Sequence, residues 1–302
     1  MSAGRSAAGR LGSGHTLRQL VRRLYWSGRK RLGGRRLARF RLVRHLEGLV
    51  RSAIRSDVVE VLGQRMVLDS RDGAELSTNG IYEPLTTDVV RREVREGHTV
   101  LDIGAHIGYY TLLFARQVGP QGRVFAFEPA PGTLALLEQN IRLNGYHNVT
   151  LIPRAVSDVA GRARLYVDET NVGDSRIYDS RDGRPFVPIE TVRLDDALAG
   201  HLGSIHFIKM DIQGAEYAAL RGMLGLLQAH PEAKLVTEFW PYGLKTFGVE
   251  PEAYLHLLLE QSFHLFNLDE RAGRILPVSP KQLLTRYPPT FASATNLFCL
   301  RR

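Results

Sequence analysis

Residues 100–108 read VLDIGAHIG and contain the strongest indication of the fold. This stretch joins a run of β-type apolar residues to a turn that carries two glycines, and a helical pattern follows to about residue 118. Gly104 can take a positive φ and lets a ligand approach the backbone, and Gly108 allows close contact between helix and strand. In open α/β sheets, ligands bind at the carboxyl ends of strands near the switch in strand order. The turn therefore predicts a ligand site, but alone it does not identify the ligand.

Strands and helices alternate along the chain around this turn. Further strands are expected at residues 123–128, 149–156, 206–212, 234–240, 263–268 and 296–300, with helices at 131–144, 214–228 and 251–261. Near-continuous runs of Val, Ile, Leu and Phe joined by helices are typical of a mostly parallel sheet buried on both faces. The pattern predicts an α/β, Rossmann-like, doubly wound domain. A hairpin-like entry from residue 58 and an inserted pair of strands around the polar loop 171–185 complete it.

A carboxylate follows the second expected strand, at Glu128, twenty residues after Gly108. In that position it can accept hydrogen bonds from both hydroxyls of an adenosine ribose. Nicotinamide enzymes share this arrangement, but their fingerprint is G-x-G-x-x-G, and here the spacing is G-x-x-x-G with His106 two residues after Gly104. A histidine there crowds a diphosphate and is compatible with a methionine tail, whose ammonium Asp102 could anchor directly or through water. The sequence therefore favours S-adenosylmethionine over a dinucleotide.

Two later strands also end in carboxylates. In KMDIQGAE, Lys209 and Asp211 lie two residues apart on an extended strand and so share one face, and Asp211 falls at the carboxyl end. Glu238 ends the next strand, in LVTEFWP. Glu216 lies in a first helical turn, where a carboxylate is also explained by the helix dipole. We expect Asp211 and Glu238 to face the same rim of the sheet, either as functional groups or, for Glu238, in an ion pair with Lys209 or an arginine.

Together these motifs resemble the FkbM family of S-adenosylmethionine-dependent methyltransferases. The likeness runs from about Gly80 to the C-terminus and is carried by GIYEP (80–84), VLDIGAHIGYYT (100–111), FAFEPAP (125–131), NIRLNG (140–145), AVSD (155–158), IKMDIQGAEYAALRGM (208–223) and VTEFWP (236–241). The resemblance implies a class I methyltransferase that O-methylates hydroxyls of small molecules or glycans, typically sugars or polyketide-type natural products.

The resemblance also implies a set of cofactor contacts. By motif matching these are Glu83, Asp102, Gly104, Ala105, Gly108, Glu128, Pro129 and Asp211, with the backbone around Ala155 and Val156 against the adenine. The chain departs from the family at His106, where Asn is usual, and at Gln213, where Glu is usual. The resemblance therefore implies no role for the side chains of His106 and Gln213.

The expected reaction is an in-line displacement in which a substrate hydroxyl attacks the sulfonium methyl group. The protein then has to align the reacting atoms and remove a proton. We hypothesise that Asp211 or Glu238 accepts that proton, with His106 as a further candidate. Either carboxylate could instead hold a divalent metal, although no metal-ligand set is predicted. The acceptor pocket is expected from the loop 171–185, the region before Gly80 and the segment 241–250.

Two other functions compete with this hypothesis. An RNA ribose 2′-O-methyltransferase would recruit Lys209 and the carboxylates and hold phosphates with the basic N-terminus. A non-catalytic module would keep the cofactor pocket while the N-terminus acted at a membrane or on a partner. Methyltransferases that act on base amino groups usually carry an Asn/Asp-Pro-Pro-aromatic motif, which KMDIQG lacks.

The positive charge of the chain belongs to its N-terminal extension. Residues 1–57 hold fifteen Lys and Arg against two Asp and Glu, a net charge of +13, so residues 58–302 hold 25 against 29, a net charge of −4. A mildly acidic catalytic domain argues against a nucleic-acid partner. Basic amphipathic helices are expected around 17–26 and 37–46, and residues 16–55 suit either packing on the domain or peripheral contact with an anionic membrane.

Location is inferred from what the sequence lacks. No run approaches the roughly 18 consecutive apolar residues that span a bilayer, and a secretory signal is missing, so a cytoplasmic enzyme is expected. Cys299 is the single cysteine and lies in the apolar run NLFCL, which predicts a buried thiol.

Overall fold

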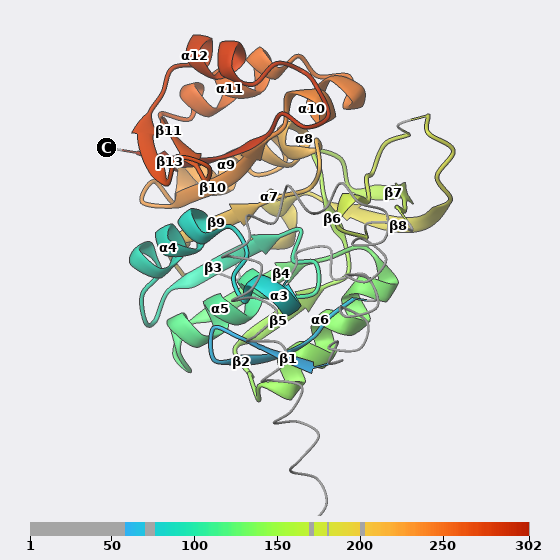
Figure 1. Cartoon of the computed structure of the whole chain (residues 1–302), viewed down its shortest axis with the longest axis vertical. Helices are drawn as coiled ribbons and strands as arrows, with labels where there is room; N and C mark the ends of the chain where they lie inside the picture. The colour runs from blue at the N-terminus through green and yellow to red at the C-terminus, as the bar shows by residue number, and fades with distance from the viewer. Residues whose placement is uncertain (1–57, 70–75, 169–171, 180, 200–202, 302) are drawn as a thin grey trace, which may run out of the picture. The chain divides into compact units, whose positions relative to one another are not determined.

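The computed structural model describes residues 58–69, 76–168, 172–179, 181–199 and 203–301. Their central sheet consists of β3 (Thr99–Ile103), β4 (Arg123–Phe127), β5 (Val149–Ile152), β9 (Phe207–Met210), β10 (Lys234–Phe239), β11 (His264–Asp269), β12 (Arg274–Pro277) and β13 (Thr295–Leu300). Figure 1 shows the sheet, whose strand order is β12-β11-β13-β10-β9-β3-β4-β5. The five strands from β10 to β5 in this order pair in parallel, whereas β13 runs antiparallel to β10 and β11.

The chain reverses its direction of travel across the sheet between β3 and β9. From β3 it moves outward through β4 to β5, and it then returns to β9 on the other side of β3 and continues to β10. At such a switch point the loops leave in opposite directions, and a crevice opens at the carboxyl ends of the two strands. The stretch VLDIGAHIG lies at this point. The predicted doubly wound, Rossmann-like fold is therefore confirmed.

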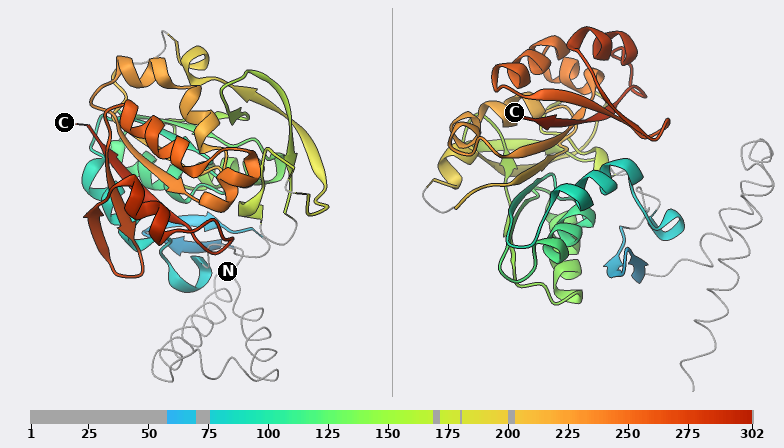
Figure 2. Two further views of the ribbon diagram at one scale, coloured as in Figure 1. Left: turned by 90° about the horizontal axis from the view of Figure 1, so that it is seen from above. Right: turned by 90° about the vertical axis from the view of Figure 1, so that its left-hand side faces the viewer.

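Helices cover both faces of the sheet (Figure 2). One face carries α4 (Pro84–Glu93), α5 (Tyr109–Val118) and α6 (Pro131–Leu143), and the other carries α8 (Glu216–Arg221), α9 (Leu224–Ala229), α10 (Pro241–Phe247), α11 (Pro251–Glu260) and α12 (Pro280–Arg286). Two four-residue helices, α3 (Leu76–Asn79) and α7 (Leu194–Ala197), lie in connections.

The two faces correspond to two apolar cores. Successive side chains of a strand point to opposite faces, and on β3 Val100 joins the core that contains Phe114 of α5, while Leu101 joins the core that contains Leu255 of α11. Both β3 side chains are fully buried. A strand covered on both sides has no face toward water, which explains why Val100, Leu101 and Ile103 of β3 are all apolar.

The entry hairpin is present as predicted and is tied to the glycine turn. It consists of β1 (Val58–Val61) and β2 (Gln64–Val67), which pair antiparallel. Asn140 on α6 accepts a hydrogen bond from the Val67 N–H (2.6 Å) and donates to the carbonyls of Val67 (3.0 Å) and Ile107 (2.8 Å). One buried amide thus holds the hairpin, α6 and the turn together.

The inserted pair of strands forms its own small sheet. It consists of β6 (Ala155–Val156), β7 (Gly161–Tyr166) and β8 (Phe186–Val192) in the order β6-β8-β7, with a short 3₁₀ helix, η2 (Val172–Asp174), between β7 and β8. The prediction of one strand over 149–156 was wrong. The chain leaves the central sheet after Ile152, because Pro153 has no N–H to continue the ladder, and Ala155–Val156 pairs with β8 instead.

The predicted helix 214–228 is also two helices, α8 and α9. They separate at Gly222, where a β-carbon would lie 2.1 Å from the carbonyl oxygen of Ser157. The loop that follows β6 packs directly against this backbone, so only glycine fits. Local periodicity does not reveal such a contact between distant segments.

Predictions for the N-terminal extension, including its helices and the membrane contact of residues 16–55, fall outside the described residues. Across the described ranges, no helix combines the length and apolar character that crossing a bilayer requires. Cys299 is fully buried on β13, as predicted, and burial raises the pKa of its thiol.

Candidate active site

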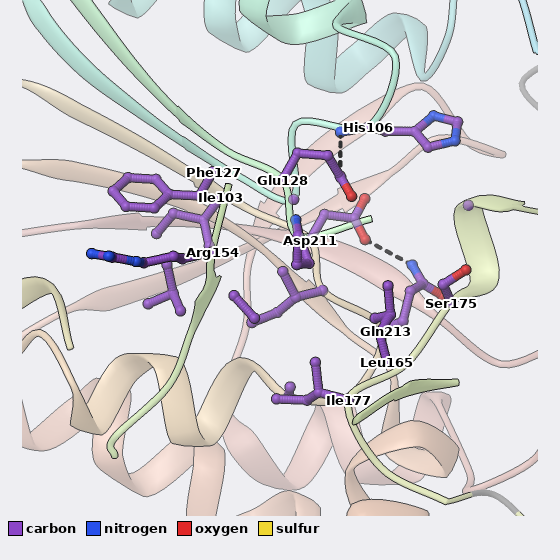
Figure 3. A pocket seen from close by; sticks show the side chains of 17 residues that line it. Ile103, His106, Phe127, Glu128, Arg154, Leu165, Ser175, Ile177, Asp211 and Gln213 are labelled. Atoms are coloured by element: carbon purple, nitrogen blue, oxygen red, sulfur yellow. Dashed lines mark hydrogen bonds between the residues drawn. The ribbon is translucent and has the colours of Figure 1, made fainter. Parts of the chain in front are cut away.

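A pocket lies at the carboxyl ends of β3, β4 and β9 (Figure 3). Its other walls come from β6 and from residues 173–177 of the insertion. The pocket encloses about 590 Å³, including space open to solvent. We call it the first pocket. The predicted site residues that line it are Gly104, His106, Glu128, Pro129, Ala155, Val156 and Asp211.

Gly104 brings two strand ends into contact at the floor of this pocket. Its φ is +83°, and a β-carbon there would lie 2.0 Å from the carbonyl oxygen of Asp211. The N–H groups of Gly104 and Ala105 both donate to the Phe127 carbonyl at 3.0 Å, which fixes the turn to the end of β4. Ala105 is buried and Gly108 precedes α5, so these two predicted residues shape the turn and do not line the pocket.

Glu128 lies beside this turn, where the sequence placed it. Its carboxylate accepts hydrogen bonds from the main-chain N–H groups of His106 and Ala130, both at 2.9 Å, and the residue is 7% exposed. Burial raises the pKa of Glu128 to about 7, although the two N–H groups oppose that rise. Each carboxylate oxygen keeps a lone pair for a further donor.

His106 lines the same pocket and carries a buried, unpaired polar atom in its ring. Its Nε2 is buried without a hydrogen-bond partner among the described residues. Burial lowers the pKa of its imidazole, which is therefore neutral near pH 7. The ring extends away from Asp211 and Gln213 (Figure 3).

Asp102 does not line the first pocket. It is 1% exposed, and its Oδ2 accepts a hydrogen bond from the Thr111 hydroxyl at 2.5 Å. Burial raises the pKa of Asp102 to about 6, while the Thr111 hydroxyl lowers it. Of the two expected ways in which Asp102 could anchor the methionine ammonium, the buried position of its carboxylate disfavours direct contact, and its hydrogen bond to Thr111 joins β3 to α5.

The predicted carboxylates at the ends of β9 and β10 are brought together by Gln213. Its Nε2 donates to Asp211 Oδ1 (2.8 Å) and to Glu238 Oε2 (3.3 Å). Asp211 also accepts from Lys209 Nζ at 3.2 Å, so the expected shared face of these two residues is present. Gln213 has a φ of +57°, and its carbonyl accepts a hydrogen bond from the Tyr178 hydroxyl at 2.9 Å.

The charged groups of this cluster shift one another's pKa values. Burial and then the charge of Asp211 raise the pKa of Glu238 well above its ordinary value. Burial alone would lower the pKa of the Lys209 ammonium, but the carboxylates of Asp211 and Glu83 outweigh it and raise that pKa. The alternative interpretation, an ion pair of Glu238 with Lys209 or an arginine, finds no support among the described residues, where Lys209 pairs with Asp211.

A second pocket adjoins the cluster on its far side. It is lined by Glu83 and Glu238 and by residues of the segments 268–272 and 286–296. Glu83 therefore belongs to the second pocket and not, as the motif match implied, to the first. Its carboxylate accepts hydrogen bonds from the Tyr110 hydroxyl (2.8 Å) and from Asn296 Nδ2 (2.7 Å).

The two pockets meet at one side chain. Gln213 lines the first pocket and its amide contacts Glu238, which lines the second. Of the regions expected to form the acceptor pocket, residues 173–177 line the first pocket instead. The connections 270–272 and 287–294 of this pocket gave no signal in the sequence, because their position follows from the pairing of β11, β12 and β13.

A family model described as the methyltransferase FkbM domain matches residues 102–265, more than half of the 302-residue chain. The chain belongs to the FkbM methyltransferase family. The resemblance inferred from the motifs is thereby confirmed, and this FkbM methyltransferase uses S-adenosylmethionine as its cofactor.

Two curated relatives of this FkbM methyltransferase are fungal and bacterial. Methyltransferase 1 of Beauveria bassiana is 29% identical over 144 residues, which cover 41% of this chain and 57% of the relative. The 31-O-demethyl-FK506 methyltransferase FkbM of Streptomyces tacrolimicus is 28% identical over 162 residues, which cover 43% and 61% of the two chains. The matches thus span about six tenths of these relatives' lengths.

A solved structure, Aeropyrum pernix fibrillarin with natively bound S-adenosylmethionine, is similar at 11% identity and a TM-score of 0.40, over 72% of this chain and 74% of fibrillarin. That likeness is too distant to transfer any residue or ligand. Within the described residues of this FkbM methyltransferase, no cluster of three or more His, Cys, Asp and Glu side chains is arranged to hold a metal ion.

Proposed function

We propose that this FkbM methyltransferase transfers a methyl group from S-adenosylmethionine to a hydroxyl of a small molecule or glycan. The observation that carries the proposal is the Asp211–Gln213–Glu238 cluster, which stands between two pockets and contacts both. A group-transfer enzyme needs this arrangement, because donor and acceptor must meet at one point from separate sites.

The first pocket suits the cofactor in its chemistry. Glu128 has lone pairs free to accept both ribose hydroxyls, and Ala155 and Val156 provide an apolar wall for the adenine. The buried, unpaired Nε2 of His106 suits the polar end of the methionine part. In this proposal His106 is a cofactor contact and not the base, since its ring extends away from Asp211.

The second pocket suits a hydroxyl-bearing acceptor. Hydroxyl groups donate hydrogen bonds, and the side chains that line its inner end include the carboxylates of Glu83 and Glu238. The relative from Streptomyces tacrolimicus is named for a 31-O-demethyl acceptor, which supports transfer to oxygen.

Glu238 is the proposed general base. When bound, S-adenosylmethionine supplies an electrophilic methyl group on its sulfonium. Asp211 already accepts from Lys209 and Gln213, whereas Glu238 accepts only the 3.3 Å bond from Gln213 among the described residues. Its raised pKa makes Glu238 a stronger base than an ordinary carboxylate once it is ionised. Glu238 takes the hydroxyl proton while Asp211 and Gln213 hold its position.

The proposal is tested by removing the base and locating the product. Glu238→Gln should lower methyl transfer by about 100-fold or more while the Kd for S-adenosylmethionine stays within about twofold. The assay transfers a labelled methyl group to fractionated metabolites and glycolipids, followed by mass spectrometry and NMR of the labelled product. Glu250→Gln, which changes an exposed carboxylate paired with Lys245, is the matched control. A label on nitrogen or carbon, or full activity of Glu238→Gln, would contradict the proposal.

The alternative of an RNA ribose methyltransferase is less well supported. Lys209, which would hold a phosphate, is 1% exposed and paired with Asp211. We propose no nucleic-acid partner. Cytoplasmic location and contact of residues 16–55 with an anionic membrane surface stay proposals. The membrane contact is tested by sedimentation with anionic vesicles, in which the full chain is compared with a variant that starts at Ser56.

A further inference from the structure

Arg176 is a fully buried cation whose contacts come from both sides of the active site. It is 2% exposed, and its Nη2 and Nε donate to the Asp174 carboxylate at 2.7–3.1 Å. Its guanidinium lies 4.8 Å from the ring centre of Trp240 and 5.9 Å from that of Phe291. A buried arginine is tolerated only where a carboxylate and aromatic faces replace water, so its position is closely defined.

The segment around Arg176 forms a wall of the first pocket. Gly173, Ser175 and Ile177, on either side of it, line that pocket. Asp174 is held from a second direction as well, because Arg184 donates to its carboxylate at 3.0 Å. The hydrogen-bonded pair of Asp174 and Arg176 therefore sets how residues 173–177 lie against the pocket.

The aromatic contacts of Arg176 connect it to residues that line the second pocket. Trp240 follows β10, is 3% exposed, and donates from Nε1 to the carbonyl of Phe291 at 3.0 Å. Phe291 is 61% exposed, and its ring contacts the rings of Trp240 and Tyr242 and the guanidinium of Arg176. The neighbours of Phe291, namely Thr290, Ala292 and Ser293, line the second pocket.

We propose that Arg176 is a positioning residue that couples the two pockets. A ligand in the first pocket restricts residues 173–177 to one conformation, and this fixes the Arg176 guanidinium against Trp240. Trp240 in turn holds the Phe291 carbonyl and with it residues 290–294, which form a wall of the second pocket. Cofactor binding thereby completes the acceptor pocket. Because such coupling is reciprocal, an acceptor also tightens the binding of the cofactor. The inference rests on the proposed function in taking the second pocket as the acceptor site.

Amide hydrogen exchange of the full chain, with and without S-adenosylmethionine, tests the coupling without a known acceptor. In the wild type, the cofactor should slow exchange of residues 173–177 and also of residues 290–294, each by at least about fivefold, the low end of typical coupling. In Arg176→Met the effect should persist at 173–177 and disappear at 290–294. The variant keeps an apolar chain on Trp240, and Asp174 keeps Arg184.

A second variant and a matched control separate coupling from damage to the fold. Trp240→Phe keeps an aromatic face for Arg176 but removes the N–H that holds the Phe291 carbonyl, and it should also lose the effect at 290–294. Arg164→Met removes an exposed arginine whose guanidinium lies 4.5 Å from the Phe186 ring centre in the small sheet, and it should keep both effects.

Slowed exchange at 290–294 that survives in both Arg176→Met and Trp240→Phe would overturn the inference, as would an unaffected 290–294 segment in a wild type that binds the cofactor. Neither result touches the proposed reaction. The proposed reaction is contradicted instead by a label on nitrogen or carbon in the labelling experiment.

Discussion

Lowering the pH from 8 to 6 should weaken binding of S-adenosylmethionine about tenfold through Glu128 alone. Two ribose hydroxyls donate hydrogen bonds, so the carboxylate has to be ionised to accept both. The pKa of Glu128 is raised to about 7 by burial, and the ionised fraction therefore falls from about nine tenths at pH 8 to about one tenth at pH 6. One unit of pKa corresponds to about 1.4 kcal/mol, which is the expected loss of binding free energy.

In the protein without cofactor, the raised pKa of Glu128 makes the folded state more stable at low pH than at high pH. Below the ordinary pKa of the carboxyl, Glu128 is protonated in both folded and unfolded chains, and its stabilising contribution is fully present. Between that value and about pH 7 only the folded chain holds the proton, so this contribution is lost as the pH rises through about 7. Cofactor binding should therefore release a proton near neutral pH and offset this loss.

Isothermal titration calorimetry at pH 6, 7 and 8, in two buffers of different ionisation enthalpy, measures both the affinity and the released proton. Glu128→Gln should bind the cofactor more weakly at pH 8 by about 1.5–3 kcal/mol, the contribution of a hydrogen bond to a charged group, and its affinity should no longer depend on this titration. Glu138→Gln, an exposed carboxylate paired with Arg142 on α6, is the control. A pH dependence in Glu128→Gln equal to that of the wild type would refute the reasoning.

Two further substitutions test the framework of the site. Gly104→Ala should abolish cofactor binding and lower the melting temperature, because its β-carbon would lie 2.0 Å from the Asp211 carbonyl oxygen. The control Gly132→Ala should change neither, because a β-carbon there has no atom within 4 Å. An unchanged melting temperature for Gly104→Ala would contradict the close approach of the two strand ends. Lys209→Met should lower the free energy of unfolding by about 3–5 kcal/mol, measured by urea denaturation. The loss should be larger at pH 8 than at pH 6, because removing the cation raises the pKa of the neighbouring carboxylates, whose stability contribution is then lost as the pH rises. The exposed Lys245→Met is its control, and a loss that is equal at both pH values would count against this account.

Much of the site could be predicted because its signals are local. The turn after β3 and the carboxylates that end β4, β9 and β10 each follow a buried strand, and parallel strands bring their carboxyl ends to one edge. Glu128, Asp211 and Glu238 were located in this way. Gln213 was noted only as a departure from the family, since its role as a bridge depends on a positive φ that brings its amide between two strand ends.

Periodicity and residues close together in the chain were enough to predict the alternation of strands and helices, the family, and the edge of the sheet at which the glycine turn lies. Only the tertiary structure decided that Glu83 and Asn296 share the second pocket, that Asp102 lies beneath the turn, and that Arg176 contacts Trp240 and Phe291. Each of those contacts joins segments far apart in sequence, and packing between such segments leaves no periodic trace in any one of them.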